Sequence, residues 1–304
     1  MNKAYKYGMN IELDPGIDVD RLTPTSGTLE ISDESVMEGE KSIKIEGKKD
    51  ITIKHSAQGT ESADLIITLE PGSESTIILE KEGEGAFISE NTRIIAKKNS
   101  KLTFIGFQSL SEDTVVFQSR DIDIHKDARV EMIDVSLGGK YSKLDVKSKL
   151  LEEGAEAANS ILFMTKGKKV YNGNAESHHL APNTMSELQT KGVLKDHSRA
   201  LSRGLVKMGN DSRGSSGHQR QDSLLLSGQA EADAIPKLEI ENHDVKCSHG
   251  TTIGEPDKEK LFYMMSRGLS EEEAKMKIIE GYFSPVIERV VDESLKKRIL
   301  EAIR

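Results

Sequence analysis

Cys247 is the only cysteine of the chain, and it stands two positions before His249 in the segment KCSHG. A thiolate and an imidazole are typical ligands of zinc, copper and iron–sulfur clusters. Side chains two positions apart point to the same side of a strand, so an extended segment places both groups on one face. The alternative is that Cys247 is a small buried apolar residue, the common state of a free cysteine.

The composition limits the classes of function. The chain has 304 residues, one cysteine and a formal net charge of −9. A single cysteine excludes an intramolecular disulfide. With neither a signal peptide nor a run of about 18 apolar residues, we expect a cytoplasmic protein without a membrane span. The negative charge argues against nucleic acid as the main partner. The motif G-x-x-x-x-G-K-[ST] does not occur, so nucleotide energy is expected from a partner.

Short apolar segments rich in β-branched residues recur through the first 165 residues. Gly, Asn, Ser and Asp separate them, which is typical of strands joined by tight turns. This rhythm fits a sandwich or a barrel, and it fits equally a parallel β-helix in which each coil stacks on the previous one. The segments are 64–70, 75–80, 92–98, 101–107, 113–119, 121–139 and 160–167.

Residues 172–261 contain no Phe, Tyr or Trp. A core without rings must be filled by small and branched side chains, as the narrow interior of a solenoid requires, so this stretch favours the β-helix. Within it, apolar Leu238 and Ile240 occupy even positions, whereas Cys247 occupies an odd one. The change of phase predicts a corner at 241–244 and a new strand that carries the cysteine and the histidine on one side.

Towards the C-terminus the apolar residues recur at helical spacing. PDKEKLFYMMSRG predicts a short helix that ends at Gly268. SEEEAKMKIIEGYF predicts a second helix with Ser270 and Glu273 in capping-box spacing. SPVIERVVDESLKKRILEAIR predicts a third, with Ser284 as its cap and Pro285 in its first turn.

These patterns divide the chain into a β core, residues 1–255, and a C-terminal helical domain, residues 256–304. Three short helices bury little apolar surface by themselves. We therefore expect them to pack on the end of the β core or to offer an apolar surface to another protein.

Long ordered motifs between about 176 and 291 resemble the SufB/SufD family of iron–sulfur cluster assembly scaffolds. They are HHLAPNTMSELQTKGVLKDHSRALSRGLVKMGNDSRGSSGHQRQDSLLLS, AIPKLEIENHDVKCSHGTTIG and LFYMMSRGLSEEEAKMKIIEGYFSPVIERV. The resemblance implies a right-handed parallel β-helix, two subunits joined through its last strands, and C-terminal helices that dock an ABC-type ATPase, SufC. Family members usually carry an N-terminal helical region. Because the strand signals begin almost at once here, we expect a minimal archaeal or bacterial form, similar to SufB-like or SmsB-like proteins.

The resemblance also implies which residues meet a nascent cluster. In the SufB branch a cysteine follows the segment matching DSLLLSGQ, and a glutamate follows the histidine matching His249. Here Ala230 and Gly250 occupy these positions. Both departures resemble the SufD branch, which is regarded as a helper to SufB. If this chain works alone, its ligands are expected to be Cys247 and His249 first, and then Asp233, Glu241, His243 and Asp244.

One copy cannot supply the four ligands of a [4Fe-4S] cluster, whereas a two-fold dimer offers two thiolates and two imidazoles. We therefore expect a transient cluster bound across a homodimer, or a heterodimer with a paralogue, supplied by iron and sulfide donors. A SufC-like ABC ATPase is expected on the C-terminal helices, and this chain is expected to be a scaffold rather than an enzyme. The expected contacts to that partner, or to the β core, are Leu261, Phe262, Met264, Met265, Tyr282, Phe283, Val286 and Ile287.

Other functions agree less well with the sequence. Residues 191–220 carry seven Lys or Arg against two Asp but no aromatic side chain to stack a base, which disfavours nucleic acid. Polysaccharide lyases and hydrolases with a β-helix use paired carboxylates and aromatic platforms, and the absence of Trp disfavours them. A structural adaptor for the ATPase differs from a scaffold only in the role of Cys247. His178 and His179 point to opposite faces of a strand, so we expect structural roles.

Overall fold

Parallel strands make up most of this chain. The computed structural model describes residues 25–26, 29–31 and 42–304. The strands are β1 (Thr25–Ser26), β2 (Leu29–Ile31), β3 (Ser42–Ile45), β4 (Ile51–Leu69), β5 (Glu74–Ala96), β6 (Lys101–Leu110), β7 (Val115–Ile124), β8 (Arg129–Ser136), β9 (Tyr141–Leu150), β10 (Glu156–Thr165), β11 (Val170–His179), β12 (Met185–Leu194), β13 (Arg199–Met208), β14 (Ser216–Leu225), β15 (Glu231–Ile240) and β16 (Lys246–Gly254). The helices are α1 (Lys258–Ser266), α2 (Glu271–Ile287) and α3 (Glu293–Ile303).

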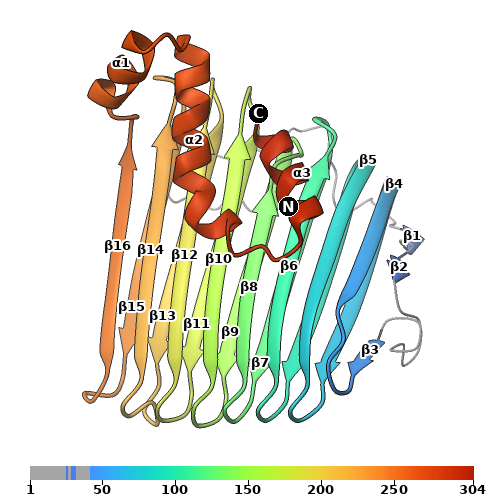
Figure 1. The fold of residues 1–304 in the computed structure, drawn as a ribbon. Coiled ribbons are helices and arrows are strands. Elements are labelled where there is room, and N and C mark those ends of the chain that lie inside the picture. The colour runs from blue at the N-terminus through green and yellow to red at the C-terminus, as the bar shows by residue number, and fades with distance from the viewer. Residues whose placement is uncertain (1–24, 27–28, 32–41) are drawn as a thin grey trace, which may run out of the picture.

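From β6 onward, neighbouring strands in space are two places apart in sequence. β10 pairs in parallel with β8 and β12, and β11 pairs in parallel with β9 and β13. Side chains that hydrogen-bond between successive coils are correspondingly far apart in the chain, 26 residues for Lys48 and Glu74 and 33 for Thr165 and Ser198. The chain is therefore a parallel β-helix, which confirms the predicted fold class over the sandwich and the barrel (Figure 1).

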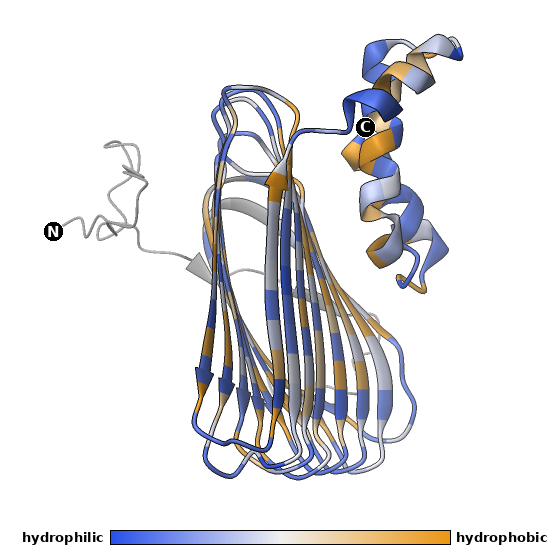
Figure 2. Cartoon of the chain, turned by 90° about the vertical axis from the view of Figure 1, so that its left-hand side faces the viewer, coloured by the Kyte–Doolittle hydropathy of each residue, from blue (hydrophilic) through white to orange (hydrophobic). Residues whose placement is uncertain are grey.

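The β-helix consists of two sheets that face each other across a narrow interior. The first half of β5 pairs with β6 and its second half pairs with β7, so one strand bends from one sheet into the other. Thereafter the even-numbered strands form one sheet and the odd-numbered strands the other. Figure 2 looks along the axis from the end that carries β16 and shows both sheets edge-on. Interior positions of the first coils are filled by Ile and Leu, among them Ile53, Ile67 and Ile77.

One residue with positive φ recurs at the same corner of successive coils, where an odd sheet strand ends and the next even strand begins. Asn99 (φ 57°), Asp127 (φ 52°) and Asn183 (φ 56°) take this position, and Gly154 (φ 72°) and Gly214 (φ 71°) replace them in other coils. Gly, Asn and Asp tolerate this backbone conformation best. The turn residues that separate the apolar segments in the sequence therefore mark the corners of the coils.

The two longer helices cover the outer face of the even-numbered sheet and not the end of the β-helix (Figures 1 and 2). Buried side chains from both helices form one apolar cluster with outward-facing residues of the sheet. Arg289 pairs with Glu131 at 2.6 Å, and Arg298 pairs with Glu80 at 2.6 Å, so ion pairs flank the cluster. The sheet contributes Ile78, Ile105, Phe107, Ile133, Val135, Leu162 and Val193, and the helices contribute Ile279, Phe283, Val286, Ile287, Leu295, Ile299 and Ile303.

The prediction that the third helix begins at Ser284 was wrong. α2 continues through Pro285 to Ile287, and α3 begins after Asp292, whose carboxylate accepts from the backbone N–H of Leu295 at 2.7 Å. Proline has no N–H for the carbonyl of Gly281, but the hydroxyl of Ser284 donates to that oxygen at 3.1 Å. Burial of the following residues against the sheet offsets the cost of a proline inside the helix.

The boundaries of three strand segments also differ from the prediction. Segment 121–139 is not one unit, because 121–124 completes β7 and 129–136 forms β8, with a corner between them. Segments 75–80 and 92–98 belong largely to the single long strand β5. The predicted corner at 241–244, the helix stop at Gly268 and the capping box of Ser270 are confirmed. None of the helices in the described ranges is both long and apolar enough to cross a membrane.

Candidate functional site

β16 presents Cys247 and His249 at the open end of the β-helix. The register sets Cys247 beside Gly217 and His249 beside Gln219 of β14. Gly217 is an interior position, since a Cβ atom there would lie 2.6 Å from a methyl carbon of Val206. Cys247 and His249 therefore both face the interior side of the final coil, as the alternation predicted. Among the described strands, β16 has no neighbour beyond it, so Cys247 is half-buried and His249 is exposed.

The thiol of Cys247 is in its protonated form at neutral pH. Partial burial raises the pKa of the thiol above its ordinary value, and a hydrogen bond from the backbone N–H of Gly217 offsets part of this effect. The thiolate is the form that binds metals, so coordination must displace the proton. A soft cation at the open end would supply the charge that favours this loss.

The four weaker ligand candidates lie away from this pair. Asp233 lies between Ala232 and Ala234, which face the interior, so its side chain faces outward from the odd-numbered sheet. Glu241 pairs with Lys207 at 3.2 Å, and Asp244 pairs with Arg213 at 3.2 Å. His243 is exposed in the corner between the two last strands. In the described part of the chain, no three His, Cys, Asp or Glu side chains gather closely enough to hold a metal ion.

The sequence analysis did not single out two buried residues that lie beside Cys247 and His249. Gln219 and Gln221 lie on β14 at interior positions, in register with His249 and Thr251. The alternation in GHQRQDS would place them on one face, but it does not tell which face of the strand is the interior. Only the tertiary structure does so, because this face of β14 lies against Gly204 and Val206 of β13.

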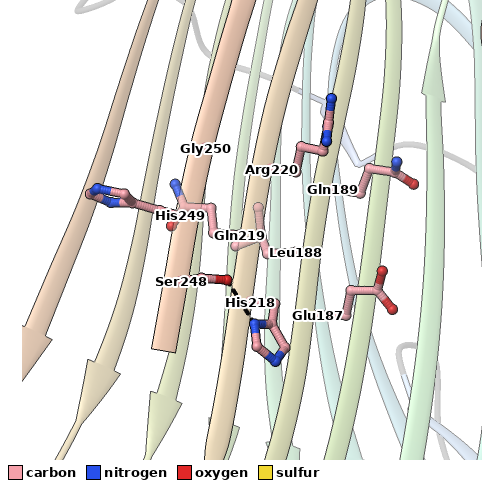
Figure 3. A pocket seen from close by; sticks show the side chains of 9 residues that line it. All are labelled: Glu187, Leu188, Gln189, His218, Gln219, Arg220, Ser248, His249 and Gly250. Carbon is pink, nitrogen blue, oxygen red and sulfur yellow. Dashed lines mark hydrogen bonds between the residues drawn. The ribbon is translucent and has the colours of Figure 1, made fainter. Parts of the chain in front are cut away.

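The outer face of the same strands carries a depression of about 330 Å³. Ser248 lies there, and its hydroxyl is 2.8 Å from Nδ1 of His218. Figure 3 shows His249 on the opposite side of its strand from Ser248 and His218. The side chains of Ser248 and His218 therefore lie on the other side of the strands from those of Cys247 and His249. Its lining residues are Glu187, Leu188, Gln189, His218, Gln219, Arg220, Ser248, His249 and Gly250.

Strands β15 and β16 leave apolar side chains uncovered at this end of the β-helix. Ile235 is 39% exposed, Ile240 is 50% exposed and Ile253 is 42% exposed. Both strands have one pairing partner each among the strands described here. Open strand edges with apolar side chains are typical of surfaces that associate with another chain.

α1 also exposes apolar side chains. It has no buried residue, and Phe262 is 73% exposed. Tyr263 and Met265 are exposed beside it, whereas Leu261 and Met264 are half-buried. Of the residues expected to contact a partner on α2, Phe283, Val286 and Ile287 are buried against the sheet, and Tyr282 is half-buried. The accessible part of the expected docking surface is therefore α1.

Several of the basic residues of 191–220 are paired with acidic side chains. Arg199 pairs with Glu231 at 3.3 Å, Lys207 with Glu241 at 3.2 Å and Arg220 with Asp222 at 2.7 Å. Arg203 donates to the side chain of Asn172 at 2.6 Å. Arg199 and Lys207 are thus paired with acids of the next coil and Arg220 with an acid of its own strand, which reduces the positive charge available to a nucleic acid.

The histidine pair of β11 is divided between the two faces of the strand, as predicted. His179 is buried, with its ring nitrogens 2.7 Å from the hydroxyls of Thr184 and Ser186. His178 faces outward, 2.8 Å from Glu176. Both interactions are internal to the β-helix.

Comparison with known proteins finds a family whose sequence pattern this chain matches. Residues 51–282 match the family described as "SUF system FeS cluster assembly, SufBD core domain". "Iron-sulfur cluster assembly SufBD family protein" of Staphylococcus epidermidis ATCC 12228 is 31% identical over 193 residues. The corresponding proteins of Staphylococcus saprophyticus and Staphylococcus aureus USA300 are 31% identical over 193 residues as well. The matched part is 63% of this chain but 41% of each relative, so the chain matches about two fifths of their length.

Proposed function

This chain belongs to the SufBD family of the SUF iron–sulfur cluster assembly system, and from that premise we propose that it is a scaffold subunit on which a nascent cluster is assembled. The single observation that carries the proposal is the placement of Cys247 and His249 together on the interior side of the last, open coil. A thiolate and an imidazole are ligands for iron in clusters. The cluster is the cargo of the protein, to be released to a recipient.

The cargo is held between two copies of the last coil. One copy supplies two of the four ligands of a cubane [4Fe-4S] cluster, and an isologous interface brings the same two residues from its partner. The exposed Ile235, Ile240 and Ile253 support association at this end. The second copy is another molecule of this chain or a paralogue of the same family. Ligation by both imidazole and thiolate suits a protein that must let its cargo go.

ATP hydrolysis is assigned to a SufC-like ABC ATPase that docks on α1. Phe262, Tyr263 and Met265 offer an exposed apolar surface on a helix that buries nothing against the β-helix. Such surfaces are typical of protein–protein contacts. This chain therefore acts without catalysis of its own, and its work is to bind iron and sulfide from their donors.

The experiment that tests the scaffold role compares the full chain, co-expressed with its ATPase and purified without oxygen, with two variants. We expect wild type to hold iron and acid-labile sulfide and to absorb in the visible range. We expect Cys247→Ser and His249→Ala to lose most of the iron and most of the sulfide. Ser248→Ala is the matched control, because Ser248 lies on the same strand but faces the outside. Full cluster retention by Cys247→Ser would remove this residue from the mechanism.

A second candidate is a SufD-like helper that assists a cluster-binding paralogue. Ala230 and Gly250 favour it, because residues other than cysteine and glutamate stand at these positions. A wild type that stays free of iron and sulfide alone, but increases the cluster content of a co-expressed paralogue, would establish the helper role instead.

A further inference from the structure

Two glutamine side chains lie in the interior of the last but one coil without a hydrogen-bond partner. Gln219 is 3% exposed and Gln221 is 1% exposed. The Nε2 and Oε1 atoms of both amides find no partner among the described residues. Buried amides that make no hydrogen bond are strongly unfavourable, and native interiors hold few of them. Two neighbouring side chains with this defect point to a polar species that reaches them.

The opposite strand leaves space for these amides. Gly204 of β13 faces them across the interior, and a Cβ atom on it would lie 2.1 Å from Nε2 of Gln219 and 2.8 Å from Nε2 of Gln221. The two amide nitrogens thus converge on the place that a side chain of residue 204 would fill. Any larger residue there would force both amides to move.

The two amides lie on the strand next to the one that carries the candidate ligands. Gln219 is in register with His249, and Gln221 with Thr251, so one strand spacing of about 4.8 Å separates the rows. The opposite wall of the final coil is made of small side chains, Ala232, Ala234 and Pro236, in register with Ala200, Ser202 and Gly204. This wall of the final coil therefore carries no large side chain at these three positions.

The chemistry of the amides matches an anionic sulfur cargo. A glutamine amide offers two N–H donors, and hydrogen bonds from N–H groups to cluster sulfur or thiolate are a recognised way in which proteins stabilise clusters. We propose that Gln219 and Gln221 form the floor of the cargo site and donate N–H hydrogen bonds to the sulfur atoms of a cluster, or of its sulfide-bearing precursor, held by Cys247 and His249. This inference rests on the proposed function and adds two residues to it.

The test uses Gln219→Leu and Gln221→Leu in the full chain co-expressed with its ATPase. Leucine has a similar size and removes both donors and acceptors, so the metal-free variants should unfold at an unchanged or higher temperature. Their iron and sulfide content should fall about tenfold, as expected for the loss of residues that support metal ligands. The position of the visible absorption bands of any remaining cluster should shift. Gln189→Leu, on the outer face of β12, is the matched control and should change none of these.

The possible results separate this inference from the function on which it rests. A wild type that binds no iron and sulfide overturns both proposals. A wild type that binds them, with leucine variants that bind them equally and with the same spectrum, overturns only the floor and leaves Cys247 and His249 as ligands. In that case the amides bind internal water alone. A fall in unfolding temperature that accompanies the loss of cargo in both variants would also contradict the inference, because it would show that the amides stabilise the apoprotein.

Discussion

The ammonium group of Lys81 and the carboxylate of Glu90 meet 2.6 Å apart inside the β-helix, although both come from the single strand β5. The strand bends between them from one sheet to the other, so the pair crosses the interior, and the exposed fractions of the two side chains are 1% and 2%. Arg120 contacts Glu90 as well and lies 3.4 Å from Asp134 of the facing sheet. Burial favours the neutral carboxyl, but Arg120 and Lys81 outweigh it and lower the pKa of Glu90 to about 2.

Glu90→Gln should destabilise the protein by about 3–5 kcal/mol, because it leaves buried positive charges with fewer partners. The double variant Lys81→Met, Glu90→Gln removes one charge of each sign and keeps the Arg120–Asp134 pair, so we expect it to be more stable than the single variant. Chemical denaturation of wild type, Lys81→Met, Glu90→Gln and the double variant measures this. A double variant that loses the sum of two single losses would show that Lys81 and Glu90 are not coupled.

His179 should make stability depend on pH. Burial, and to a smaller degree the neighbouring His178, lower the pKa of the folded imidazole from 6.5 to about 4. The contribution is therefore complete above pH 6.5 and is lost as the pH falls towards 4, by about 3 kcal/mol in all. His179→Gln should flatten this part of the curve of unfolding free energy against pH, whereas His178→Gln, on the outer face, should make it only slightly less steep. An equally steep curve for both variants would contradict the assignment.

Pro285→Ala should raise stability by about 1–3 kcal/mol. Alanine restores an N–H for the carbonyl of Gly281 and removes the steric conflict of a proline inside α2. Thermal unfolding followed by circular dichroism measures the gain. A loss of stability would mean that the path imposed by proline is needed to seat Val286 and Ile287 on the sheet.

Gly204→Ala should cost about 1–3 kcal/mol through overpacking of the interior, because the new methyl group collides with the amides of Gln219 and Gln221. Adding Gln219→Ala frees space and should recover part of the loss. Urea denaturation of the single and double variants tests this. A stable Gly204→Ala protein would show that the amides can move aside freely.

Phe262→Asp on α1 should abolish co-purification with the SufC-like ATPase while leaving the unfolding temperature unchanged, since this side chain is 73% exposed and supports no core. The matched control is Val291→Asp, an equally exposed apolar residue between α2 and α3 (65%). Loss of binding in both variants would extend the docking surface beyond α1, and retention in Phe262→Asp would reject α1. A truncation after β16 is less informative, because it would uncover the apolar face formed by Ile105, Phe107 and Val135.

Local patterns in the sequence were enough to predict short strands joined by turns, the corner before β16, the capping box of Ser270 and the common side of Cys247 and His249, but they left sandwich, barrel and β-helix open. Each of these depends on residues within a few positions of one another, where alternation and turn chemistry act directly. The absence of Phe, Tyr and Trp from 172–261 favoured a β-helix, because its narrow interior takes small and branched side chains. The motifs that resemble the SufB/SufD family pointed to the same fold and to the same pair of residues.

Only the tertiary structure decided what lies between the coils. The crossing of Lys81 and Glu90 and the facing of Gly204 by Gln219 depend on how the two sheets face each other, and the pairing of Lys207 with an acid of the next coil depends on strand register. Register couples residues some 26 to 33 positions apart, and no short pattern records it. The prediction of a helix start at Ser284 and Pro285 was wrong because it, too, depends on residues far away in the sequence. A proline at a helix start and a proline inside a helix look alike in sequence, and burial of the next turn against the distant sheet made the difference.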